Sequence, residues 1–317
     1  MALLNDEKLR VLAVSLQRRL IVLAVRVFSY SITGISLVKS LLLPLDLLRN
    51  IRSWYWIMTH LKILRPEESR IQNLIRYHRA RVDRIVWSAL GHNAWDGTVK
   101  YHDFSRVDDL RIIASRGKGL LLLGMHYGPL FGGYVLTQGG LNPVILAAQA
   151  NIPNLDRIPL KRLLTNEYIF RGTYDGIVAA NHSERQFIKM MLAGRPGMIM
   201  MDGTAKRNVR ATPCLGMNYP VGIFPFKLAL RHAFPAVIMW FSKIRGSGYR
   251  LNIEEICFSS VEEGVAQYGA LLDQVVRADP FLWDDEGYCA HIVPGGKRSP
   301  FSGRWLMGHK ERVPPRE

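Results

Sequence analysis

The sequence predicts an α/β fold, in which a mainly parallel central sheet is flanked by helices and preceded by an N-terminal helical region. Two observations carry this prediction. From about residue 100, short apolar segments bounded by glycine or proline alternate with amphipathic segments, as in sheets built from strands and helical connections. The run Leu120–Leu123 is apolar at every position and lies between glycines, which is typical of a strand covered on both faces.

Length and composition bound the organisation of the chain. Its 317 residues, 48% of them hydrophobic, suffice for one large domain or two smaller ones with a sizeable core. We expect a helical segment at 1–63 and an α/β domain at 64–317, with its core at about 100–285. The net charge of +16 indicates an anionic partner: a membrane surface, a nucleic acid or a phosphorylated substrate. Three widely spaced cysteines (Cys214, Cys257 and Cys289) form no C-x-x-C pair and favour a reducing compartment.

Residues 9–48 are the most hydrophobic part of the chain. The nineteen residues 20–38 contain Arg26 as their single charge, and residues 1–84 hold 15 basic against 6 acidic side chains. Three interpretations stay open: a helix lying in the membrane interface, a single spanning helix, and a buried amphipathic helix. The basic flanks favour contact with anionic lipid headgroups, so we expect residues 9–48 to mediate membrane association.

The helices and strands follow in order from local signals. Pro44 is expected to end the first helix, because proline lacks an amide donor. Apolar residues recur every three or four positions from Glu67 to Leu90, which predicts a helix. Further helices are expected at 108–115, 184–192, 224–233 and 261–277, and strands at 119–125, 143–148, 197–201, 236–242 and 249–256. Gly194 is a plausible C-terminal stop for the helix before it, and the alternation at 249–256 predicts an exposed strand.

One motif carries chemistry. The strand at 119–125 delivers His126 directly into a glycine-rich turn that begins at Gly128. Ligands of α/β sheets usually bind at the carboxyl ends of strands, and a histidine there can act as a general base near neutral pH. The sequence holds no G-x-S-x-G, G-x-x-x-x-G-K-[ST], H-E-x-x-H or G-x-G-x-x-G motif, which disfavours common serine hydrolases, P-loop enzymes, zincins and simple dinucleotide enzymes.

Residues 105–285 resemble the bacterial lysophospholipid acyltransferase superfamily, and within it the late acyltransferases of lipid A biosynthesis. A series of features in order carries the resemblance. They are Leu-Leu-Leu-Leu-Gly-Met-His126, Asn166-Glu-Tyr-Ile-Phe-Arg171-Gly172, Gly197-Met-Ile-Met-Met-Asp202-Gly, Thr212-Pro-Cys-Leu-Gly-Met-Asn-Tyr-Pro220, Phe226 to Ile238, and Ala278-Asp-Pro-Phe-Leu-Trp283. An N-terminal membrane-associating helix is also usual in that family. The resemblance implies acyl transfer at the cytoplasmic face of the inner membrane, with His126 as the catalytic base.

The chain departs from the family at one position. The family places Asp or Glu four intervening residues after the histidine, and here that position is Phe131. Two explanations follow. Asp202, at the end of a neighbouring predicted strand, supplies the carboxylate that orients the imidazole, or the chemistry is weakened, altered or lost.

Several further residues are candidates for substrate binding. Lys206, Arg207 and Arg210 form a basic loop suited to a phosphate or phosphopantetheine group, and Arg171 matches a family position for acceptor phosphate. The backbone N–H groups of Tyr127 and Gly128 are candidates for an oxyanion site. Cys214 has little support as a nucleophile. We expect no metal and no cofactor besides the acyl thioester co-substrate.

The predicted function is transfer of a fatty acyl group from acyl carrier protein or coenzyme A to a hydroxyl or amine of a lipid, glycolipid or related acceptor. The basic surface suits both donors, since carrier proteins are acidic and coenzyme A is polyphosphorylated. The alternative is a catalytically impaired relative that binds lipid or a membrane partner, which Phe131 favours. A nucleic-acid binder is disfavoured, because the charge clusters beside the most hydrophobic segment.

Overall fold

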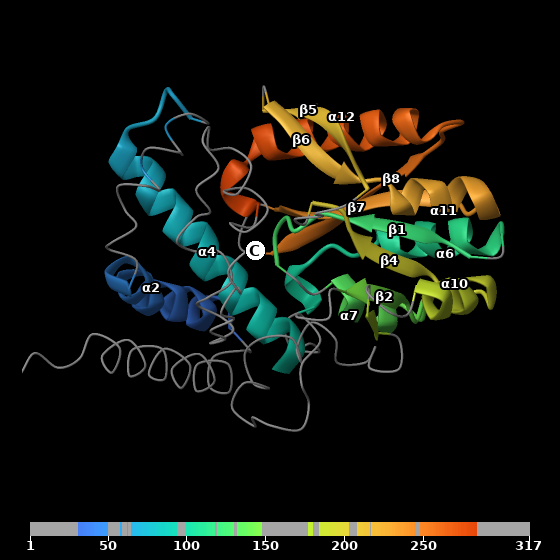
Figure 1. Cartoon of the computed structure of the whole chain (residues 1–317). Coiled ribbons are helices and arrows are strands. Elements are labelled where there is room, and N and C mark those ends of the chain that lie inside the picture. Colours follow the sequence, from blue (N-terminus) through green and yellow to red (C-terminus); the bar gives the residue numbers. More distant parts are fainter. Residues whose placement is uncertain are drawn as a thin grey trace, which may run out of the picture.

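The computed structural model describes residues 31–49, 58, 62, 65–93, 99–117, 119–129, 132–147, 177–179, 184–202, 208–215, 217–244 and 248–283. Within these ranges the chain is an α/β structure, with α2 and α4 together at one end of the molecule and the sheet with its helices at the other (Figure 1). The fold class predicted from the sequence is confirmed as a mixed, mostly parallel sheet flanked by helices.

The central sheet has six strands in the order β3-β2-β4-β1-β7-β8. Their bounds are β1 Leu121–Gly124, β2 Val144–Ala147, β3 Ile177–Ala179, β4 Gly197–Met200, β7 Ala236–Lys243 and β8 Tyr249–Ile256. All neighbours pair in parallel except β7 and β8, which are antiparallel. β1 lies between β4 and β7, and Leu120–Leu123 are fully buried, as the unbroken apolar run predicts.

The sheet is covered on both faces. α10 (Glu184–Leu192) packs on Gly197, where an added Cβ would come within 2.3 Å of Met191 Sδ, so only glycine lets this helix approach the strand. Successive strand residues point to opposite faces, and the next residue, Met198, contacts α7 (Gly132–Gln138) instead. The other helices of this part are α6 (Arg106–Ser115), α11 (Phe224–His232) and α12 (Val261–Ala278). Short 3-10 turns are η2 (Val99–Tyr101) and η5 (Pro280–Leu282).

A second, two-stranded sheet was not predicted from the sequence. It pairs β5 (Val209–Cys214) with β6 (Met217–Gly222) in antiparallel fashion and packs against α12. Pro213 and Pro220 lie within these strands, and proline is a signal against a central strand. A ribbon of only two strands places both strands at an edge, where proline is tolerated.

The N-terminal helices also depart from expectation in one respect. Pro44 does not end the first helix, because α2 runs from Ile32 to Arg49 and contains it. Leu42 and Asp46 on either side of Pro44 are buried, so tertiary packing outweighs the local cost of proline. α4 (Arg70–Asn93) agrees with the predicted helix at 67–90. In the described ranges, no helix combines the length and apolar content needed to cross a bilayer.

A buried carboxylate joins these two helices to the sheet. Asp83 of α4 lies 2.5 Å from Lys39 Nζ of α2 and 3.3 Å from Lys243 Nζ of β7, and it accepts the hydroxyl hydrogen bond of Tyr249 on β8. Burial lowers the pKa of Lys39, and the Asp83 charge opposes this effect. Because the buried Asp83 carboxylate contacts groups from three other elements, loss of α2 would leave its charge partly uncompensated.

Candidate active site

His126 lies at the carboxyl edge of the parallel sheet. β1 ends at Gly124, and the chain turns at Gly128, whose φ is +81° and whose Cβ, if present, would lie 2.7 Å from the Phe241 carbonyl oxygen. Glycine is therefore required for the turn that follows the histidine. The imidazole is 29% exposed, so solvent and a substrate can reach part of the ring.

Asp202 follows β4 at the same edge and is fully buried. Its Oδ1 lies 2.7 Å from Nδ1 of His126, and its two oxygens accept the main-chain N–H of His126 at 2.9 and 2.8 Å. The predicted contact between these two side chains is thus observed. A carboxylate can only accept in this contact, so Nδ1 carries the proton and the reactive lone pair belongs to Nε2.

Two aromatic residues that were not predicted as site residues complete the surroundings of Asp202. The indole N–H of Trp283 donates to Oδ2 of Asp202 at 2.6 Å, and the hydroxyl of Tyr219 donates to the main-chain oxygen of Asp202 at 2.8 Å. Both side chains are buried. Trp283 closes the sequence segment Ala278–Trp283, but no local pattern shows that its ring reaches a residue 81 positions away.

The titratable groups beside Asp202 are held neutral. Burial raises the pKa of the Cys214 thiol to about 12, with charges that include Asp202 adding to the effect. Burial, followed by the charge of Asp202, also raises the pKa of Tyr219 and of Tyr268 well above the usual tyrosine value. Cys214 is therefore a buried thiol that stays protonated near neutral pH, which agrees with the prediction that it is not the nucleophile.

One of the two predicted oxyanion donors already has a partner within the protein. The Gly128 N–H donates to the Leu282 carbonyl at 2.8 Å, so the prediction that it faces a substrate oxygen is wrong in this structure. The reason is an antiparallel bridge between Tyr127 and Trp283, which turns the Gly128 amide toward the C-terminal segment. The Tyr127 side chain is buried, and its hydroxyl donates to the Asp279 carbonyl at 2.8 Å.

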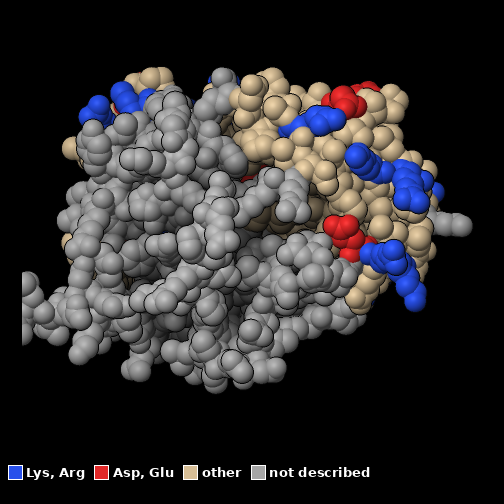
Figure 2. Space-filling model, viewed as in Figure 1, with Lys and Arg blue, Asp and Glu red and all other residues tan. Residues whose placement is uncertain are grey.

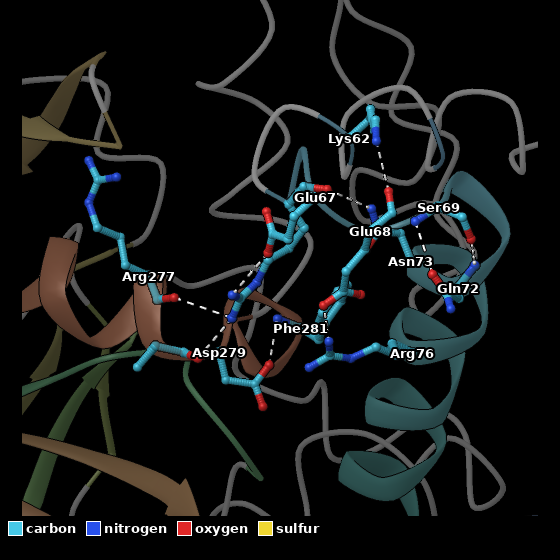
Figure 3. Close-up of polar contacts among 12 residues, drawn as sticks. Lys62, Glu67, Glu68, Ser69, Gln72, Asn73, Arg76, Arg277, Asp279 and Phe281 are labelled. Atoms are coloured by element: carbon cyan, nitrogen blue, oxygen red, sulfur yellow. Dashed lines mark hydrogen bonds and ion pairs between the residues drawn. The ribbon is translucent and has the colours of Figure 1, made fainter.

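The segment that carries Trp283 is fixed from the N-terminal side of the chain. Arg65 donates from its guanidinium to the carbonyls of Arg277 and Ala278, at 3.3 and 2.9 Å. The Arg76 guanidinium lies over the Phe281 ring, 4.7 Å from its centroid, and pairs with Glu68 (Figure 3). These contacts join α4 to η5, so the position of the indole depends on residues outside the sheet.

Of the predicted phosphate-binding residues, Arg210 is described. It lies in β5 rather than in a loop, is exposed, and its Nε is 3.5 Å from Glu262 Oε1. Arg171, Lys206, Arg207 and Phe131 lie outside the described residues. Across the part of the chain that the structure describes, no three His, Cys, Asp or Glu side chains gather as a metal site.

No protein-family model matches this chain, and no curated protein matches its sequence. The chemical interpretation therefore depends on the geometry. A partly exposed imidazole, held by a buried carboxylate at the carboxyl edge of a parallel sheet, is suited to taking a proton from a bound hydroxyl or amine.

Proposed function

We propose that this protein is a membrane-associated acyltransferase that uses an acyl thioester, from acyl carrier protein or coenzyme A, to acylate a hydroxyl or amine of a lipid, glycolipid or related acceptor. The observation that carries the proposal is the 2.7 Å contact between His126 Nδ1 and the buried Asp202 carboxylate. It supplies, from another strand, the acid that the Phe131 position lacks.

The reaction proceeds by direct transfer. Nε2 of His126 takes the proton from the acceptor hydroxyl or amine as that atom attacks the thioester carbonyl carbon. The tetrahedral oxyanion collapses, the carbon–sulfur bond breaks, and the leaving thiolate takes the proton back from the imidazolium. Asp202 keeps Nδ1 protonated and stabilises the imidazolium that forms between these two steps.

Substrate binding is assigned to the positive charge of the chain. Lys206, Arg207 and Arg171 are proposed to bind phosphate groups of the donor or acceptor by charge-assisted hydrogen bonds. Arg210 has an exposed guanidinium whose contact with Glu262 is a surface ion pair, so it can exchange this partner for a substrate phosphate. Lys and Arg side chains also gather on the side of the molecule formed by α10 and α11 (Figure 2). Exposed members of that group are Arg185, Lys189, Lys227 and Arg231.

The second candidate function is a non-catalytic relative that binds lipid or a membrane partner, and Phe131 is the feature that favours it. The two candidates differ in what they require of His126. A binding protein has no need of a buried carboxylate directed at a partly exposed imidazole, and this contact therefore counts in favour of the enzyme.

The test is an acyl-transfer assay with the full chain. The purified protein is incubated with acyl carrier protein or coenzyme A carrying a labelled acyl chain, and with total lipid extract as acceptor. We expect a labelled lipid with wild-type protein and none with His126→Ala, which should fold with a lower melting temperature because buried Asp202 loses one of its donors. Retention of full transfer by a folded His126→Ala protein would exclude the mechanism.

A further inference from the structure

We propose that Trp283 is a positioning residue for the His126–Asp202 pair: its indole N–H fixes which carboxylate oxygen faces the imidazole and draws part of the negative charge away from it. The inference deepens the proposed function and rests on it in one respect, namely that His126 acts as the base. The hydrogen bond itself is part of the structure, with Nε1 at 2.6 Å from Oδ2.

The two oxygens of the Asp202 carboxylate have different side-chain partners. The main-chain N–H of His126 lies 2.9 Å from Oδ1 and 2.8 Å from Oδ2, so it does not distinguish between them. The indole of Trp283 contacts Oδ2, and the imidazole contacts Oδ1. Without the indole donor, the plane of the carboxylate is fixed less firmly, so the imidazole keeps its anionic partner but no longer meets it at a defined angle.

The indole of Trp283 is held firmly in place by its burial, its packing and its main-chain contacts. Trp283 is 2% exposed, and its ring packs against that of Tyr219 with 5.5 Å between centroids. Its main chain forms the bridge with Tyr127, the residue that follows His126, and the neighbouring Gly128–Leu282 hydrogen bond is 2.8 Å long. The donor is therefore attached to the same turn that presents the base.

The negative charge of Asp202 is surrounded by side chains that stay neutral. Among the residues that the structure describes, the titratable side chains around Asp202 are Cys214 of β5, Tyr219 of β6, Tyr268 of α12 and His126 itself. The first three are held neutral, because burial and the Asp202 charge raise their pKa values. Within this described set, the negative charge of Asp202 is shared between N–H donors of His126 and Trp283. Removing the indole donor leaves more of that charge for the imidazolium.

The experiment uses a chemical readout that requires no substrate. Diethyl pyrocarbonate modifies neutral imidazole, and mass spectrometry of the peptide containing His126 gives the modification rate at each pH. We expect Trp283→Phe to move the midpoint of this pH profile upward by about half a unit to one unit, because the protonated ring gains a stronger anion. Replacing Trp283 by 3-benzothienylalanine, which keeps the ring shape and lacks the N–H, should produce the same shift and decides the matter if the phenylalanine variant does not fold.

Two matched controls separate the hydrogen bond from packing. Trp240→Phe removes a partly exposed indole elsewhere, and Tyr219→Phe removes the donor to the main chain of Asp202 while leaving the carboxylate contacts in place. Neither should move the midpoint. An unmoved profile in the benzothienylalanine protein, or an equal shift in Tyr219→Phe, would overturn the proposal. Because no acyl donor is present, these outcomes stand apart from success or failure of the acyl-transfer assay.

Discussion

His126 and Asp202 occupy equivalent positions on neighbouring strands, each two residues beyond the register pair Gly124 and Met200 that closes the parallel β1–β4 ladder. Parallel strands in register bring equivalent positions to the same edge of the sheet. The two side chains therefore meet although 76 residues separate them. The carboxylate that contacts His126 Nδ1 thus follows the adjacent strand β4 in the chain, whereas the fifth residue after the histidine is Phe131.

Asp202→Asn tests whether Asp202 orients His126 as the proposed base. The amide cannot hold Nδ1 protonated or stabilise an imidazolium, so acyl transfer should fall by about 10⁴-fold. Phe131→Glu provides the counterpart in the same assay. It should help little if Asp202 already orients the base, whereas a clear gain of activity would indicate that Asp202 does not serve this role.

How far the sequence predicts this fold can be judged from particular elements. α10 occupies the predicted residues 184–192, because an apolar face and a glycine stop coincide there, and Gly194, the predicted stop, has a positive φ of +94°. β1 and β4 are short apolar runs with clear glycine boundaries. The shared edge of His126 and Asp202 follows from the parallel arrangement, so this part of the site was predictable.

Other features depend on contacts that no local pattern records. The β5–β6 ribbon contains two prolines, which are a signal against a strand, and its turn residue with a φ of +55° is Leu215 and not glycine or asparagine. The local sequence therefore predicts neither the strands nor the turn. Trp283 reaches Asp202 because η5 is bridged to the turn after β1. Such a contact is a property of the assembled chain, and a lone tryptophan in sequence is more simply a core residue.

His102 should make the fold acid-sensitive. Burial, followed by the charge of Lys39, lowers the pKa of His102 to about 4, so the folded protein leaves it neutral where the unfolded chain binds a proton. The contribution of neutral His102 to the free energy of unfolding is therefore complete above pH 6.5 and is lost as the pH falls toward 4. The loss amounts to about 2 kcal/mol at pH 5. The free energy of unfolding, measured with denaturant at pH 8 and pH 5, should differ less between the two pH values in His102→Gln than in wild type. His232→Gln is the control and should show the wild-type difference.

Gly128→Ala should destabilise the turn that presents His126. Two effects add: a positive φ disfavours any Cβ, and this Cβ would lie 2.7 Å from the Phe241 carbonyl oxygen. Gly194→Ala is the matched control, because Gly194 also has a positive φ but nothing lies within 4 Å of its added Cβ. We expect about 1 kcal/mol for Gly194→Ala and at least about 2 kcal/mol more for Gly128→Ala in chemical denaturation. Equal losses would show that the turn relaxes away from Phe241.

Membrane association should be separable from folding, provided that the truncation spares α2. Deleting residues 1–30 removes nothing that the structure describes, and should move the protein from the membrane fraction toward the soluble one. Deleting residues 1–45 would also remove buried Ile35, Val38 and Leu42 and take Lys39 from Asp83, so it should unfold the protein. An unchanged membrane fraction for a folded 31–317 protein would place the attachment outside residues 1–30.

The exposed side of α2 provides the second half of this prediction. Leu37 and Leu41 are 49% and 59% exposed and lie one turn apart, so they can contact lipid while the buried side of α2 stays packed in the core. Leu37→Glu with Leu41→Glu should weaken binding to vesicles containing anionic lipid, because two carboxylates replace apolar contacts at a negative surface. Ile112→Glu, at a side chain of α6 that is 57% exposed, is the matched control and should bind as wild type does. Equal binding by all three proteins in vesicle flotation would assign membrane contact to a surface other than α2.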